Sequence, residues 1–300
     1  MSLILAEGAS IKPIISVMNM RTTTEPHYPR VLSIAGSDSG GGAGIQADLK
    51  TVGALGCYGM TAITAVTAQN TQGVRAIHAV PPDILAAQIE AVLEDIGADA
   101  VKIGMLPNPQ SAQAVAQAIR RFDLKNVVLD TVMVASSGDR LMAQETQAVL
   151  VHELFGLATV VTPNLDEAAL LLGREIADSE AMEPAARELR ALGARNVLLK
   201  GGHLVGDEVV DMLLQPDRPV LRLASPRIAS NNVHGTGCTL SSAIAAHLAT
   251  GHSLEDAVRL ARAYILGAIA AGVAVQTGHG HGPLNHGHAP VAMQILPARR

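Results

Sequence analysis

The chain has 300 residues, 48% of them hydrophobic and 16% charged, and carries a formal net charge of −5 at pH 7. This composition supports a large apolar core and disfavours extensive disorder. Only 2% of the residues are aromatic and the net charge is acidic, so we expect no nucleic-acid partner. The length would allow two domains, but the absence of a repeat or a long linker favours one.

Neither the cysteines nor the apolar segments indicate secretion or a membrane. The two cysteines, Cys57 and Cys238, lack the number and spacing of a disulfide framework or a zinc site. The longest apolar run, residues 263–275, is shorter than the roughly 20 residues that span a bilayer, and the first residues do not form a secretory signal. We therefore expect a cytoplasmic protein without a membrane partner.

Strands and helices alternate from residue 30 onward, whereas residues 1–29 show no strong period and are predicted to be a flexible arm. An apolar strand over 31–36 leads through a glycine-rich loop into a helix over 45–55. Further strands are predicted over 59–69, over 101–106 and within 158–168, and two more end at Asp130 and at Lys200. A short hairpin is predicted over 208–214 and 219–224. Further helices are predicted over 82–94, 110–121, 141–154, 239–250 and 254–275. The alternation predicts a single α/β domain over 30–300 with a mostly parallel central sheet.

The glycine-rich loop raises the question of a nucleotide-binding fingerprint. Gly42, Gly44 and Ala47 match a dinucleotide-binding pattern that follows a strand. No acidic residue closes the next strand near the distance that the ribose requires, because that strand runs on to Gln69 and Asn70. Nicotinamide binding is therefore disfavoured. A Walker A loop is absent from the sequence, since no lysine follows a glycine.

Polar side chains close several of the predicted strands. In an open α/β sheet, ligands bind beyond the carboxyl ends of the strands, so Gln69 is a candidate ligand-binding residue, unless it merely closes a turn. Asp130 ends an apolar strand, where a carboxylate needs a partner or a function, and we favour a role beside phosphate and metal. Lys200 suits a phosphate, or is an ordinary solvated lysine. Asn164 and Glu167 fit the same crevice or a capping box, and both interpretations can hold together.

Residues 231–243 are predicted to bring free backbone N–H groups to a helix start. Gly235 and Gly237 let the chain bend and a ligand approach, and Thr236 is placed to cap an apolar helix that begins with Leu240. Such a terminus carries unpaired donors and about half a positive charge, which favours an anion. Cys238 is expected to have a pKa below the usual value of about 8.5 and to act as a base, or else to be a small packed residue.

The C-terminal stretch 278–288 is rich in glycine and histidine. It holds four of the eleven histidines of the chain. No carboxylate or cysteine joins them, and the glycines give no fixed face, so a surface lid or a disordered end is favoured over a metal site.

In order along the chain, these motifs resemble those of the hydroxymethylpyrimidine/phosphomethylpyrimidine kinase family in the ribokinase superfamily. The resemblance covers about residues 30–288 and rests on IAGSDSGGGAGIQADLKT, ITAVTAQNTQGV, KIGML, NVVLDTVM, TPNLDEAALLLG, LKGGHL, NVHGTGCTLSSAIAAHLA and GHGHGPLNHGH. It implies a ribokinase-like three-layer α/β/α fold, a homodimer, and the use of ATP and Mg²⁺. The acceptors would be 4-amino-5-hydroxymethyl-2-methylpyrimidine and then its monophosphate, in thiamine biosynthesis.

The resemblance also assigns roles by position. Gln69 would bind the edge of the pyrimidine. The residues around the ring would be Gly36, Ala43, Asp48, Met105 and Val132. Gly235, Thr236 and Gly237 would form an anion hole, while Cys238 stands where sugar kinases of the superfamily carry an aspartate base. The nucleotide would contact Asn164, Lys200 and Gly237, and the metal Asp130 and Glu167.

Two other functions remain open from the sequence. Some pyridoxal kinases share the GTGC-type loop, although Gln69 and Met105 favour the pyrimidine. A non-catalytic pyrimidine sensor would keep the pocket without turnover. It would have no need of Asp130, Lys200 and the GTGC turn, because these would serve a transferred phosphate.

Overall fold

The computed structural model describes residues 25–133 and 142–298, which form a mixed nine-stranded sheet with the order β3-β2-β1-β4-β5-β6-β7-β8-β9. The strands are β1 (Arg30–Asp38), β2 (Tyr58–Asn70), β3 (Gly73–Ala79), β4 (Ala100–Ile103), β5 (Val127–Leu129), β6 (Val160–Val161), β7 (Val197–Lys200), β8 (Glu208–Leu214) and β9 (Leu221–Pro226). Six strands from β2 to β7 in this order are parallel, and β3, β8 and β9 join by antiparallel pairing at the edges. The predicted mostly parallel sheet is confirmed.

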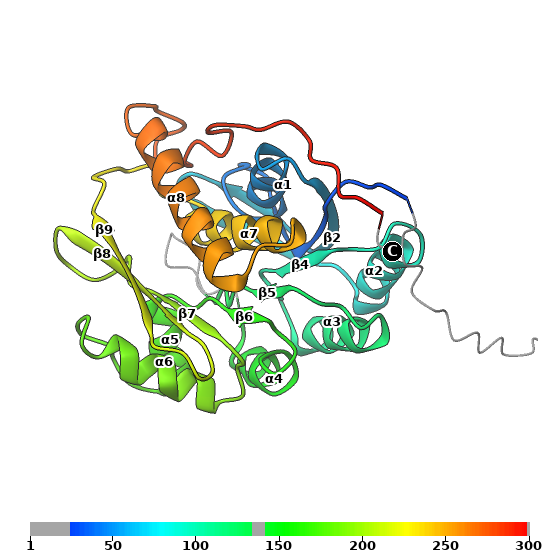
Figure 1. Ribbon diagram of the computed structural model, residues 1–300, viewed down its shortest axis with the longest axis horizontal. Helices are drawn as coiled ribbons and strands as arrows, with labels where there is room; N and C mark the ends of the chain where they lie inside the picture. Colours follow the sequence, from blue (N-terminus) through cyan, green and yellow to red (C-terminus); the bar gives the residue numbers. More distant parts are fainter. Residues whose placement is uncertain (1–24, 134–141, 299–300) are drawn as a thin grey trace, which may run out of the picture.

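Helices cover both faces of this sheet (Figure 1). They are α1 (Gly44–Ala54), α2 (Pro82–Asp95), α3 (Pro109–Arg121), α4 (Gln144–Leu154), α5 (Leu165–Leu172), α6 (Met182–Ala191), α7 (Thr236–Ala249) and α8 (Leu254–Gly272). One face carries α1, α7 and α8, and the other carries α2 to α6. The result is the expected three-layer α/β/α fold.

The inner strands bury both of their faces, because alternate residues belong to two separate cores. On β4, Ala100 packs in the core that contains α7 and α8, whereas Val101 packs in the core that contains α3 and α4. On β5, Val128 packs in the core with α7 and α8, and Leu129 packs in the core with α3 and α4. Successive side chains of a strand point to opposite faces, so a strand covered on both sides needs a continuous apolar run. This explains why these strands were visible in the sequence.

The structure differs from the sequence prediction at several elements. β3 was not predicted, because this edge strand is mostly exposed and lacks buried alternation. α6 was also missed, although its buried residues recur at helical spacing. β4 ends at Ile103 and not at residue 106, and α8 ends at Gly272 and not at residue 275. The predicted start of α4 at residue 141 lies outside the described residues.

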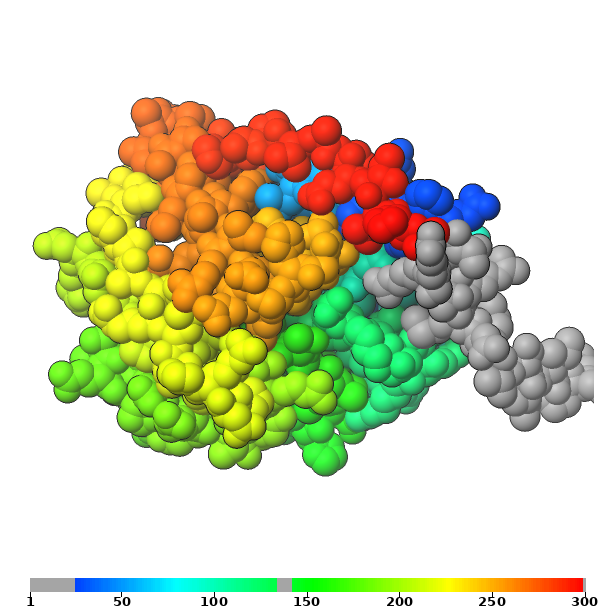
Figure 2. Space-filling model, in the orientation of Figure 1, coloured from blue at the N-terminus to red at the C-terminus, as the bar shows by residue number. Residues whose placement is uncertain are grey.

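Segments near both termini pack on the domain. His27 and Leu296 exchange backbone hydrogen bonds of 3.1 and 2.8 Å, so residues 25–29 belong to the folded body, while residues 1–24 of the predicted arm lie outside the described residues. The C-terminal segment lies across the surface (Figure 2), and within it Leu284 and His286 are buried, which does not fit a disordered end. The helices of the described chain include none with the length and apolarity to span a bilayer.

Candidate active site

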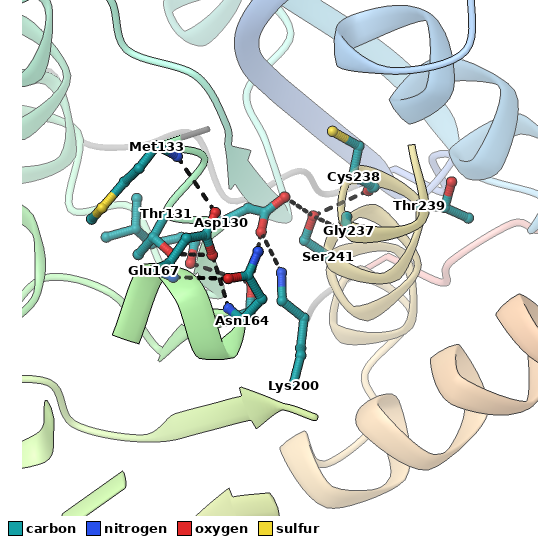
Figure 3. A network of polar contacts seen from close by, with 12 residues as sticks. Asp130, Thr131, Met133, Asn164, Glu167, Lys200, Gly237, Cys238, Thr239 and Ser241 are labelled. Carbon is teal, nitrogen blue, oxygen red and sulfur yellow. Dashed lines mark hydrogen bonds and ion pairs between the residues drawn. The ribbon is translucent and has the colours of Figure 1, made fainter. Parts of the chain in front are cut away.

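A charged pair lies at the carboxyl ends of the parallel strands. Asp130 follows β5, Lys200 ends β7, and the distance from Lys200 Nζ to Asp130 Oδ1 is 3.0 Å (Figure 3). The hydroxyls of Thr162 and Ser241 also donate to the Asp130 carboxylate, each at 3.2 Å. Burial alone would raise the pKa of Asp130, but Lys200 and then Lys102 hold it below its usual value. Both members of the pair are therefore charged at neutral pH.

The N-terminal turn of α7 lies directly beside this pair. Gly235 adopts φ +83°, and a Cβ on it would overlap the carbonyl oxygen of Gly42, so only glycine fits there. A Cβ on Gly237 would lie 3.4 Å from Lys200 Nζ and 3.7 Å from Asp130 Oδ2. The backbone of the turn is thus close enough to the pair for both to contact one anion.

The helix begins three residues earlier than the predicted 239–250, which corrects two expectations. The N-cap is Gly235 and no side-chain cap hydrogen bond is present, so Thr236 is the first helical residue and not the cap of a helix beginning at Leu240. Thr236 N–H donates to Val233 O at 3.2 Å. Thr239 N–H donates to Gly235 O at 2.9 Å, so the amides of Gly237 and Cys238 lie between these two bonded amides in the first turn, where a helix leaves its N–H groups unpaired, and they are the donors best placed for an anion.

Cys238 does not have the lowered pKa that the sequence suggested. Its sulfur is directed away from the Asp130–Lys200 pair (Figure 3), toward the side of the turn where Gly44 N–H and the Lys102–Asp48 pair lie. Burial raises the pKa of Cys238 to about 11, although Lys102 and the Gly44 N–H both favour the thiolate. The desolvation of a charged sulfur outweighs the helix terminus here, so the resting group is a thiol.

The buried Lys102 was missed in the sequence. Its Nζ lies 2.9 Å from both carboxylate oxygens of Asp48, and Asp48 also accepts from Ser33 Oγ at 2.6 Å and Ser242 Oγ at 2.7 Å. The signal was a lysine inside an apolar strand, because a buried ammonium requires a partner. Asp48, predicted to lie near the ring, is fully buried and its oxygens are occupied by these groups.

Asn164 and Glu167 form the capping box that the sequence allowed. Asn164 Oδ1 accepts from Glu167 N, and Glu167 Oε2 accepts from Asn164 N, both at 2.8 Å. Glu167 also accepts from Thr131 Oγ1 at 2.9 Å and from Met133 N at 3.4 Å (Figure 3). The box fixes the buried Glu167 carboxylate in the first turn of α5, while contacts of Asn164 with a nucleotide and of Glu167 with a metal stay predictions.

The predicted acceptor residues lie near the ends of β1, β2, β4 and β5 and at the start of α1. Gln69 is near the end of β2, and Ala43 is the N-cap of α1. A Cβ on Gly36 would lie 3.2 Å from Met105 Sδ, so these two line adjacent positions, and Met105 is buried. Val132 follows β5 and is partly buried. Their contacts with a ring stay predictions.

The glycine-rich loop after β1 binds its own carboxylate. Asp38 accepts from the amides of Gly40 at 2.8 Å, Gly42 at 3.0 Å and Ala43 at 2.8 Å. Amides that are already paired are not available to a pyrophosphate. This gives a physical reason why the loop is not a dinucleotide site.

Comparisons with known proteins agree with this geometry. The phosphomethylpyrimidine kinase family matches residues 38–285. Over 258 residues the chain is 53% identical to a hydroxymethylpyrimidine/phosphomethylpyrimidine kinase of Rhizobium meliloti, covering 86% of this chain and 96% of the relative. It is 52% identical over 261 residues to the thiamine biosynthesis bifunctional protein ThiED of Geobacter sulfurreducens, of which it spans about half, 53%.

Solved structures give the same fold. The structure of an ADP complex of Bacillus subtilis pyridoxal kinase superposes with a TM-score of 0.80 at 38% identity, covering 87% of this chain and 98% of the other. The phosphomethylpyrimidine kinase of Clostridium difficile 630 gives a TM-score of 0.71 at 43% identity, covering 80% of this chain and 99% of the other. From the match over most of its length and the identity to full-length relatives, the chain belongs to the phosphomethylpyrimidine kinase family.

Proposed function

We propose that this chain transfers the γ-phosphoryl group of ATP to 4-amino-5-hydroxymethyl-2-methylpyrimidine and then to its monophosphate, in thiamine biosynthesis. The observation that carries the proposal is the position of the α7 turn between two unlike groups. The Asp130–Lys200 pair lies on one side of it and the Cys238 sulfur is directed to the other. A phosphoryl group held at the turn would therefore have a charged donor site on one side and an acceptor on the other.

Electrostatic positioning dominates phosphoryl transfer, and the site supplies it. The amides of Gly237 and Cys238 would bind the transferred phosphoryl oxygens, and Lys200 would neutralise their charge. Asp130 holds Lys200 in place through the 3.0 Å contact. Because the transition state is loose, we assign most of the rate enhancement to these groups and less to proton transfer.

Cys238 is assigned to the first of the two steps. A hydroxymethyl group must lose a proton, whereas a phosphate monoester is already anionic. The thiolate is the minor form at neutral pH, and Lys102 and the Gly44 N–H are the groups that favour it. The second step should depend much less on Cys238.

The residues present fit a Mg²⁺ ion shared with a nucleotide. Asp130 and Glu167 supply hard carboxylate oxygens, and one oxygen of Glu167 carries only a 3.4 Å contact from Met133 N. Mg²⁺ in such sites is usually held by one or two carboxylates together with phosphates and water. When bound, the ion would screen the charge of the triphosphate. In the described residues no cluster of three or more metal-binding side chains exists.

Pyridoxal phosphorylation is the second candidate, because the Bacillus subtilis pyridoxal kinase has the same fold over 87% of this chain. A pyrimidine sensor is less well supported, since a sensor has no need of the Asp130–Lys200 pair. We also propose that the protein is cytoplasmic and homodimeric, as the family resemblance implies. Size-exclusion chromatography with light scattering tests the dimer.

Coupled measurement of ADP release with purified protein tests the function. We expect turnover with both pyrimidine acceptors and Mg²⁺, and much lower kcat/KM with pyridoxal. Lys200→Met should lower kcat by roughly 10²–10³, as for other groups that stabilise transferred charge. Lys125→Met, at an exposed surface lysine, is the matched control and should leave kcat unchanged. The proposal would be refuted if ADP were released with neither of the two pyrimidine acceptors.

A further inference from the structure

Asp38, His234, Gln69 and Thr67 form a continuous line of polar contacts at the acceptor side of the site. His234 Nε2 lies 3.1 Å from Asp38 Oδ2 and 3.4 Å from the amide nitrogen of Gln69. At the other end of the carboxamide, Gln69 Oε1 lies 3.3 Å from Thr67 Oγ1. Only a few hydrogens are available for hydrogen bonds among these four side chains. Their positions determine which end of the Gln69 carboxamide, oxygen or nitrogen, lies beside His234.

The proton on His234 Nε2 is fixed by Asp38. Burial alone would raise the pKa of Asp38, but the hydrogen bond from His234 and those from Ala43 and Gly40 hold it below its usual value. Asp38 is therefore a carboxylate, which only accepts hydrogen bonds. His234 Nε2 must carry a hydrogen and donate it. This holds for the neutral and for the charged imidazole alike.

The carboxamide of Gln69 must then turn its oxygen to His234. An amide nitrogen facing Nε2–H would place two donors against each other. At the other end, Thr67 has one hydroxyl hydrogen, and it donates this hydrogen to Ser37 O at 3.0 Å. Thr67 Oγ1 can therefore accept from an amide N–H but has no second hydrogen for an amide oxygen. Turning the carboxamide by about 180° removes the donor–donor contact, because the single Nε2–H that His234 directs to Asp38 can be shared with an amide oxygen but not with an amide N–H, and Thr67 Oγ1 then accepts from the amide nitrogen.

We propose that His234, held by Asp38, locks the Gln69 carboxamide with its oxygen toward His234 and its nitrogen toward Thr67, and so acts as a specificity-determining positioning residue. The carboxamide oxygen has two lone pairs and the nitrogen has two N–H groups, and each atom uses one of these for a contact inside the protein. The oxygen keeps one lone pair and the nitrogen one N–H for a ligand. The locked edge matches a ring that presents an amino group beside an acceptor nitrogen, and opposes a ring that presents a carbonyl beside an N–H.

The order of the oxygen and nitrogen along the Gln69 carboxamide matches the order of the amino group and ring nitrogen on the pyrimidine acceptor. Here the inference rests on the proposed function. His234 directly precedes the turn 235–238, so the oxygen of Gln69 faces the side of the phosphoryl site. On the 4-aminopyrimidine, the amino group is next to the carbon that bears the hydroxymethyl group, and the ring nitrogen is farther away. A 4-oxo ring presents a carbonyl beside an N–H. Flipping this ring to reverse the two groups would move its hydroxymethyl group away from residues 235–238.

The test compares two acceptors in wild type and variants by ADP release. The acceptors are the 4-amino-5-hydroxymethylpyrimidine and its 4-oxo counterpart, which differ in the hydrogen-bonding edge. We expect wild type to favour the amino compound in kcat/KM by about 100-fold or more, because a site with fixed donors and acceptors rejects the reversed pattern strongly. His234→Phe keeps a ring but removes the N–H, and should lower this ratio about tenfold, since one misplaced hydrogen bond is worth about that factor.

Controls and a second variant separate the lock from general damage. His247→Phe, at a half-buried histidine of α7, and Thr64→Val, whose hydroxyl donates to Met105 O, should leave the ratio unchanged. Thr67→Val removes the other end of the lock and should lower the ratio in the same direction as His234→Phe. If His234→Phe does not fold, Thr67→Val alone decides.

Equal losses with both acceptors in His234→Phe, or in Thr67→Val when it alone decides, would overturn the lock and leave these residues with a structural role. A wild-type enzyme that does not distinguish the two acceptors would overturn it as well. Both results keep the proposed function, since the amino acceptor is still phosphorylated. Lack of turnover of the amino acceptor by wild type would instead refute the proposed function and the lock together.

Discussion

Replacing Lys102 by methionine should destabilise the protein by about 3–5 kcal/mol, because it leaves a buried carboxylate without its cation. Lys102 and Asp48 are 0% and 1% exposed, and Lys102 Nζ lies 2.9 Å from both carboxylate oxygens. In the variant, Asp48 keeps the Ser33 and Ser242 hydroxyls, at 2.6 and 2.7 Å, but these are neutral donors. The expected loss is a large part of the roughly 5–15 kcal/mol that stabilises a typical domain.

Urea unfolding followed by circular dichroism measures this loss. The double variant Lys102→Met, Asp48→Asn removes both charges and should recover at least half of it, since the unpaired charge is the main cost. Arg187→Met is the control, because Arg187 and Glu183 form an exposed pair 2.6 Å apart, and it should change stability by well under 1 kcal/mol. A loss below about 1 kcal/mol for Lys102→Met, or a double variant less stable than the single one, would refute the reasoning.

Three further outcomes follow from the shifted pKa values. If the Cys238 thiolate is the base, with a pKa of about 11, kcat/KM for the hydroxymethyl acceptor should rise with pH up to that value, while the monophosphate step stays flat. Cys238→Ala should abolish this rise and lower the first step far more than the second, and equal losses in both assays would contradict the division of labour. In a Cys57→Ala background, alkylation of Cys238 by iodoacetamide at pH 8, followed by mass spectrometry, should be at least about a hundredfold slower than for a free thiol, and a rate equal to or above that of a free thiol would contradict the raised pKa. Burial, followed by Lys50, lowers the pKa of His286 to about 4, so the unfolded chain takes up this proton first as the pH falls below about 6.5. The free energy of unfolding should then drop by at most about 3 kcal/mol on acidification toward pH 4, and the drop should be smaller in His286→Gln. An identical pH dependence in wild type and His286→Gln would count against this contribution.

The fold was largely predictable from local patterns. Strands such as β4 and β5 are buried on both faces, so they form short apolar runs that stand out from the amphipathic helices between them. β3 was not predicted, because an exposed edge strand has no face that must be apolar. The start of α7 was misplaced, since Gly235 caps it through its left-handed backbone and not through the side chain of Thr236.

For the site, the sequence by itself identified the residues that close strands, because the carboxyl ends of parallel strands meet at one edge in any such fold. Asp130 and Lys200 were found in this way, whereas the 235–238 turn was found from its glycines at a helix start, and the structure brings them together. The capping box of Asn164 and Glu167 was also readable, since it depends on residues three positions apart.

Only the tertiary structure decided what surrounds each of these groups. The pKa of Cys238 depends on how much water the packed helices exclude, and burial reversed the direction that the helix terminus alone suggested. Lys102 and Asp48 are far apart in the chain, as are Asp38 and His234, and no local pattern states that either pair meets. Electrostatic energies and proton positions depend on distances and burial in three dimensions, which is why the sequence named the candidate residues but could not determine their charge states or orientations.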